Sequence, residues 1–259
     1  MKRKIQYLLF HMLLGVLLYI YPVIATYYAL GIVLIGTYYI TNKSDPFGEY
    51  PVIFSMYIIG IEVLLRMNGA KLFWEFGKYT VVYFLIIGLL RRSNHKIKIY
   101  LPILCYFIFL LPSIIWLPLD SLSSWRQQVA FNISGPFCLM ISVLYFHNRS
   151  IEVNRLIRSL FYAILPLLSM SIFIIIKMPE ISSYVFTPNS DPITSGGYGP
   201  NQVSTLYGFG LLALVLGQLK YKYLTGNKIL DISLIILFLA LGLITFSRGG
   251  MLAALIAVS

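Results

Sequence analysis

The chain has 259 residues, of which 59% are hydrophobic and 11% are charged, and its formal net charge is +11. Soluble domains contain about 25% charged residues, so the composition excludes a soluble globular protein. Apolar stretches of membrane-spanning length recur from end to end. They predict an all-α, polytopic helical membrane protein with a single transmembrane helical domain over residues 1–259.

The first apolar segment follows the basic residues Lys2, Arg3 and Lys4. It lacks the small-residue cleavage site of a signal peptide and runs into further apolar sequence, which predicts an uncleaved first span. The run 5–40 exceeds the roughly 20 residues of one span, so we expect a hairpin at Tyr21-Pro22.

Further along the chain, short polar breaks separate the other apolar runs. The run 229–259 is again too long for one span, and its natural break is Ser247-Arg248-Gly249-Gly250. We therefore expect about nine to ten transmembrane helices, with the chain truncated within the tenth span. The apolar runs are 5–21, 23–40, 51–66, 79–90, 99–118, 136–146, 159–177, 201–219 and 230–247, with a tenth from 249.

Orientation follows from the distribution of Lys and Arg, which accumulate in cytoplasmic loops. With a cytoplasmic N-terminus, most of the 20 Lys and Arg residues fall on the cytoplasmic side. The net positive charge is then explained by topology, and nucleic acid is not an expected partner. The basic residues left on the outer side are Arg66, Lys71, Lys78, Arg126, Lys177 and Arg248.

Arg248 lies between apolar runs, at the expected outer turn between the ninth and tenth spans. Placing an arginine within hydrocarbon costs free energy, so we expect Arg248 to lie at the membrane surface or to contact a partner or a ligand. We expect Gly249 and Gly250 to let the tenth span start close to its neighbours.

Two other outer segments contain groups that can bind anions. In residues 121–136, Trp125 and Arg126 fit either an interfacial amphipathic segment or a site for an anionic headgroup or substrate. In residues 178–200, a glycine-rich stretch leads to Pro200, which suits a first helical turn. Asn201 then lies where free backbone N–H groups favour anions, although a plain helix-entry turn explains this segment equally well.

Two pairs of opposite charges have helical spacing. Glu62 and Arg66 are four residues apart, and Glu75 and Lys78 are three apart, so each pair is expected to neutralise itself on one helix face. A guanidinium has five N–H donors, so Arg66 could also contribute to binding a ligand.

Metal and nucleophile patterns do not stand out in the sequence. Cys105, Cys138, His11, His95 and His147 lack the spacing of a metal site, and no nucleophile elbow is present. We expect no metal and no cofactor.

The segment "TFSRGGMLAALIA" resembles the Ser-Arg-Gly signature of the bacterial O-antigen ligase and O-antigen polymerase superfamily, and "GPNQVS" resembles the Pro-Asn element that precedes it. The resemblance covers the span pattern from about residue 50 to 259, although only these two motifs are specific. It implies a membrane glycosyltransferase that uses an undecaprenyl-pyrophosphate-linked glycan as donor and a glycan or a lipid as acceptor, in the bacterial cytoplasmic (inner) membrane.

In that family, outward-facing arginines bind the pyrophosphate, and a histidine in a late outer loop is implicated as base. Arg248 matches the signature arginine, whereas Arg126 is a second arginine by topology only. The late loop has no counterpart before Ser259, so we expect a fragment or a truncated member that is inactive by itself.

Two other functions remain open at this stage. A transporter or flippase for a lipid-linked or anionic solute should show broken helices and charges near the midplane, often in two related halves. A membrane sensor or scaffold would need a soluble output domain.

Overall fold

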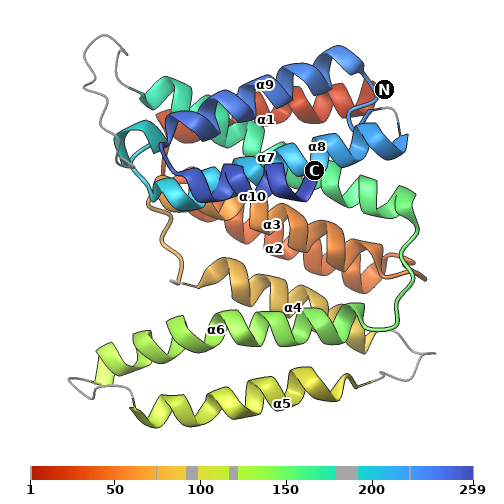
Figure 1. Cartoon of the computed structure of the whole chain (residues 1–259), viewed down its shortest axis with the longest axis vertical. Coiled ribbons are helices and arrows are strands. Elements are labelled where there is room, and N and C mark those ends of the chain that lie inside the picture. Colours follow the sequence, from red (N-terminus) through yellow and green to blue (C-terminus); the bar gives the residue numbers. More distant parts are fainter. Residues whose placement is uncertain are drawn as a thin grey trace. The chain divides into compact units, whose positions relative to one another are not determined.

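The computed structural model describes residues 2–73, 75–91, 99–116, 122–178, 192–221 and 223–258, and the regular structure in these ranges is entirely helical (Figure 1). The all-α prediction is confirmed. The helices are α1 (Lys2–Ile20), α2 (Ile24–Asn42), α3 (Glu49–Met67), α4 (Phe76–Leu90), α5 (Leu101–Leu110), the 3-10 helix η1 (Leu111–Trp116), α6 (Leu122–Phe146), α7 (Val153–Lys177), the 3-10 helix η3 (Pro192–Ser195), α8 (Pro200–Tyr221), α9 (Lys228–Ile244) and α10 (Arg248–Val258).

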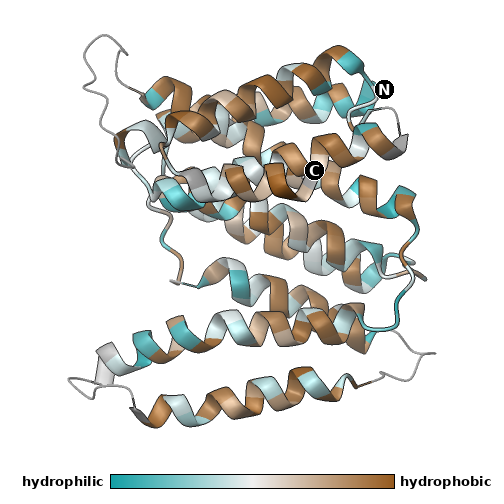
Figure 2. Ribbon diagram, in the orientation of Figure 1, coloured by the Kyte–Doolittle hydropathy of each residue, from teal (hydrophilic) through white to brown (hydrophobic). Residues whose placement is uncertain are grey.

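Six of these helices are long and apolar enough to cross a membrane, and Figure 2 shows the apolar residues along them. This indicates a membrane protein. The six segments are Lys2–Ile20, Ile24–Asn42, Glu49–Met67, Trp125–Phe146, Val153–Lys177 and Pro200–Leu219. Phe76–Leu90 and Leu101–Ile115 are shorter apolar helices.

The two expected breaks in long apolar runs are present. The chain leaves α1 at Ile20 and enters α2 at Ile24, where Pro22 interrupts the backbone hydrogen bonding of a helix. The second break occupies residues 245–247, so Arg248 is the first residue of α10.

The expectation for the sixth span was wrong at its start. The apolar run 136–146 would extend only about 17 Å as a helix, too short to cross a bilayer. The helix instead begins at Leu122, and the segment around Arg126 is part of it. The fifth run also departs from the expectation, since α5 ends at Leu110 and continues as η1, where Pro112 cannot donate an α-helical hydrogen bond.

The chain divides into two compact units. Unit 1 contains Met1–Leu30, Gly60–Lys71 and Val153–Ser259, and unit 2 contains Gly31–Ile59 and Leu72–Glu152. In unit 1, α1 packs closely on α7, since a Cβ at Gly15 would lie 2.5 Å from the Ser169 carbonyl oxygen. The Ser169 hydroxyl donates to the His11 carbonyl oxygen at 2.8 Å.

The two ends of unit 1 are defined by hydrogen bonds between distant segments. At one end, the Lys4 ammonium donates to the Leu224 carbonyl oxygen at 2.7 Å, so the start of α1 meets the turn between α8 and α9. At the other end, the start of α8 meets the turn between α9 and α10, where the Ser247 hydroxyl lies 2.8 Å from the Asn201 Oδ1. This second end holds the candidate site.

Candidate functional site

The candidate site lies where α8 begins beside the start of α10. Pro200 is the first residue of α8, as expected, because proline lacks an N–H that the first turn of a helix leaves unpaired. Arg248 is the first residue of α10. The segments "GPNQVS" and "SRGG", which are distant in the sequence, lie side by side and share hydrogen bonds.

Three polar side chains join these two segments. The Ser247 hydroxyl donates to the Asn201 Oδ1 at 2.8 Å, and the Ser204 hydroxyl donates to the Ser247 carbonyl oxygen at 2.8 Å. Ser204 and Ser247 are buried, whereas Asn201 is exposed. Both the side chain and the backbone of the residue before Arg248 are thus held by α8.

Two glycines allow α8 and α10 to approach closely. A Cβ at Gly250 would lie 2.5 Å from the Ser204 carbonyl carbon, and one at Gly208 would collide with the Gly250 carbonyl oxygen. The expectation of close approach is therefore correct for Gly250. It is wrong for Gly249, where an added Cβ would meet nothing within 4 Å.

The turn before Arg248 has an unusual backbone. Phe246 has a φ of 55°, in the left-handed region that non-glycine residues seldom adopt. The Thr245 hydroxyl donates to the Gly242 carbonyl oxygen at 2.7 Å and accepts from the Ser247 N–H at 3.2 Å. These local bonds and the contacts with α8 hold the turn in a strained conformation.

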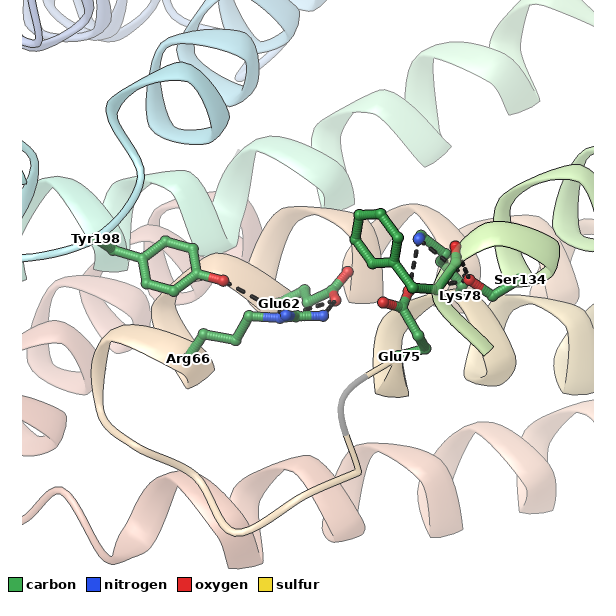
Figure 3. Close-up of polar contacts among 7 residues, drawn as sticks. Glu62, Arg66, Glu75, Lys78, Ser134 and Tyr198 are labelled. Carbon is green, nitrogen blue, oxygen red and sulfur yellow. Dashed lines mark hydrogen bonds and ion pairs between the residues drawn. The ribbon is translucent and has the colours of Figure 1, made fainter. Parts of the chain in front are cut away.

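Arg66 lies in a second polar cluster of unit 1, at the end of α3 (Figure 3). It donates to the Glu62 Oε1 from Nη2 at 2.5 Å and from Nε at 3.1 Å, so the predicted pair is confirmed. Its Nη1 donates to the Tyr198 hydroxyl at 3.4 Å. The two charged side chains are 23% and 22% exposed, which leaves the pair within reach of solvent.

Tyr198 reaches Arg66 from the loop that enters α8. Gly196 and Gly197 precede it with φ values of 71° and 80°, a conformation that glycine adopts without steric strain. A Cβ at Gly197 would lie 3.3 Å from the Lys177 ammonium nitrogen at the end of α7. This end of unit 1 therefore combines two basic side chains with the start of α8.

The second predicted ion pair, in unit 2, is also confirmed, and its carboxylate is more enclosed than that of the first pair (Figure 3). The Lys78 ammonium lies 2.5 Å from the Glu75 Oε2, and the Glu75 side chain is only 3% exposed. The Ser134 hydroxyl of α6 donates to the same Glu75 oxygen at 3.2 Å. Lys78 also lies over the Phe131 ring, 5.6 Å from its centroid, so the cluster ties α4 to α6.

The four residues expected to bind substrate fall in different parts of the chain. Arg66, Asn201 and Arg248 belong to unit 1, and Arg126 belongs to unit 2, where it is exposed near the start of α6. Ser204 stands inside the quoted "GPNQVS" motif, yet nothing in the sequence indicated its bond to Ser247.

Among the described residues, no three His, Cys, Asp or Glu side chains are grouped as a metal site would require. No protein-family model, curated protein or solved structure matches the chain.

Proposed function

We propose that the chain is a membrane glycosyltransferase of the O-antigen ligase or polymerase type. It would transfer or polymerise a glycan linked to undecaprenyl pyrophosphate, on the outer face of the bacterial cytoplasmic membrane. The proposal includes a cytoplasmic N-terminus and nine to ten membrane spans. The acceptor of the transferred glycan would be another glycan or a lipid.

The observation that carries the proposal is the contact between the two motifs that resemble this family. Asn201 of "GPNQVS" accepts a hydrogen bond from Ser247 of "SRGG". The bond joins two motifs that are 46 residues apart in the sequence. Their contact supports a common site at the start of α8 and α10.

The chemistry of arginine suits the proposed donor. A pyrophosphate at an apolar interface needs cationic hydrogen-bond donors, and a guanidinium is permanently charged and binds two oxygens at once. In the proposal, Arg248 and Arg66 of unit 1 bind the pyrophosphate, and Asn201 belongs to the same site. Arg126, in unit 2, stays a candidate second arginine on its predicted outer-side location alone. Such donors would stabilise the departing lipid pyrophosphate as its negative charge develops.

The test uses a strain that lacks the protein and is complemented with variants. Arg248→Lys should reduce surface glycan formation about ten- to a hundredfold, because it keeps the charge and loses the two-pronged geometry. Arg248→Ala should reduce it further at unchanged membrane levels. Lys71→Ala, which removes an exposed cation elsewhere in unit 1, is the control and should behave as wild type.

Near wild-type glycan from Arg248→Ala, normalised to protein amount, would reject the proposed role of this arginine. Movement of the lipid-linked glycan across vesicles containing the protein, without transfer to an acceptor, would instead identify a flippase.

A further inference from the structure

We infer that Asn201, Ser204 and Ser247 form an α8–α10 clasp that acts as a positioning device for Arg248. The inference rests on the proposed function, because it assigns these residues to the geometry of the pyrophosphate site rather than to contact with the substrate. The two hydrogen bonds of the clasp are both 2.8 Å long.

The clasp acts on the residue directly before Arg248. Asn201 and Ser204 are three residues apart, so they lie on one face of α8. One accepts from the Ser247 hydroxyl and the other donates to the Ser247 carbonyl oxygen. Two bonds in opposite senses restrict both the rotation and the sliding of the backbone that leads into Arg248.

The glycine contact brings the two helices together at the same level. Backbone atoms of Ser204 and Thr205 occupy the space that a side chain at Gly250 would need, and Gly250 in turn lies against Gly208. Because no side chain separates these backbones, α10 has little room to shift relative to α8. The backbone at the start of α10 is thus held in place before a ligand arrives, as a binding site requires.

The strained turn at residues 245–247 indicates that the position of the backbone leading into Arg248 has a function. Phe246 is left-handed at φ 55°, whereas the turn at the other end of α9 places Gly226 at its left-handed position, with φ 88°. A strained conformation persists only where its surroundings enforce it, and such residues cluster at binding and catalytic sites. A left-handed residue after a helix end is usually glycine, and here the position is occupied by an aromatic residue.

The experiment has a structural and a functional readout, both on the full chain in nanodiscs. Hydrogen exchange of the peptide covering residues 244–251 measures the clasp itself. Ser204→Ala and Ser247→Ala should each speed exchange there about five- to tenfold, since each removes one hydrogen bond of the clasp. Ser247→Thr keeps the hydroxyl and should restore protection.

The matched control is Thr205→Val. The Thr205 hydroxyl donates to the Asn201 carbonyl oxygen within α8, at 2.7 Å, and its bond does not reach the turn. Removing it should leave exchange of residues 244–251 and ligand binding unchanged. Thermal midpoints of all variants show whether each one is folded.

The functional readout is the affinity for undecaprenyl pyrophosphate. Ser204→Ala should weaken binding about fivefold when Arg248 is present. In an Arg248→Lys background the same change should have little effect, because an ammonium has no planar fork to misalign. This non-additivity is the mark of a residue that acts through Arg248.

Equal losses in the two backgrounds would overturn the positioning role, as would unchanged exchange in both alanine variants. Absence of binding by the wild-type protein would overturn the proposed function, and the positioning role with it. The exchange data would then still show whether the clasp holds the turn, so the two failures can be told apart.

Discussion

The two turns that flank α9 close the same helix by different means. The turn before α9 is held by Asp231, whose side chain is fully buried and accepts from the Leu224 N–H at 2.6 Å and the Thr225 N–H at 2.9 Å. The Thr225 hydroxyl also donates to it. The turn after α9 is held by neutral groups, two of which come from α8.

The difference separates a structural turn from a candidate functional one. In the first turn, the carboxylate satisfies nearby N–H groups, and the left-handed position is taken by Gly226. The second turn is strained at Phe246, depends on a neighbouring helix and leads directly into Arg248. The buried acidic residue Asp231 thus stabilises the first turn. Arg248 follows the second turn, whose conformation depends on contacts with α8.

The largest expected effect concerns the sides of the membrane on which these turns lie. The probes are introduced into a protein whose Cys105 and Cys138 are first replaced by serine. Lys228→Cys marks the turn before α9, and Ile193→Cys marks the end of unit 1 that contains the turn after α9. An impermeant thiol reagent added to intact spheroplasts should label Cys at 193 and leave Cys at 228 unlabelled, as the distribution of basic residues predicts. The opposite pattern would reverse the proposed orientation.

The next effect tests the buried carboxylate. Asp231→Ala should lower the free energy of unfolding by about 4 kcal/mol, because two buried backbone N–H groups lose their acceptor at about 1–3 kcal/mol each. Asp45 is the matched control, since it accepts from the Glu49 and Tyr50 N–H groups at a half-buried helix start. Asp45→Ala should lower the same quantity by only about 1 kcal/mol. Equal effects, measured by unfolding in detergent, would contradict the comparison.

A smaller effect distinguishes the adjacent glycines that follow Arg248. Gly250→Ala should lower the free energy of unfolding by about 1–3 kcal/mol, because its methyl group would overlap backbone atoms of α8. Gly249→Ala places its methyl group in open space and should be neutral or slightly stabilising, since alanine favours a helix by up to about 1 kcal/mol over glycine. Thermal unfolding of both variants decides whether α8 and α10 touch as described.

The smallest effect concerns the Glu62–Arg66 ion pair, which contacts Tyr198 in the loop that enters α8. Glu62→Gln should lower the free energy of unfolding by about 1 kcal/mol or less, because both partners are partly exposed. Glu75→Gln, in the enclosed pair, should lower it more. Normal levels of Glu62→Gln protein combined with loss of glycan transfer would show that this pair belongs to the site.

Much of the helical framework could be predicted from the sequence. The breaks at Pro22 and before Arg248 follow from run length, and both ion pairs follow from helical spacing. The start of α6 could not be predicted from hydropathy, because residues 122–135 are helical although they are polar in part.

The contacts of the candidate site were beyond sequence reasoning for a different reason. Ser247 and Asn201 are 46 residues apart, and no local pattern pairs a hydroxyl with a distant amide. Ser134 similarly joins the Glu75 pair from another helix, 59 residues away. Such bonds depend on tertiary packing, and neither periodicity nor composition specifies individual tertiary contacts.

The most direct test of the central claim measures the binding of undecaprenyl pyrophosphate to the protein in nanodiscs of zwitterionic lipid. Arg248→Lys should weaken binding about ten- to a hundredfold, since a charge-assisted hydrogen bond contributes about 1.5–3 kcal/mol, and Arg248→Ala should weaken it further. Lys71→Ala should bind as wild type does. Wild-type affinity in Arg248→Ala would contradict the account, because the turn after α9 would then present no ligand-binding arginine.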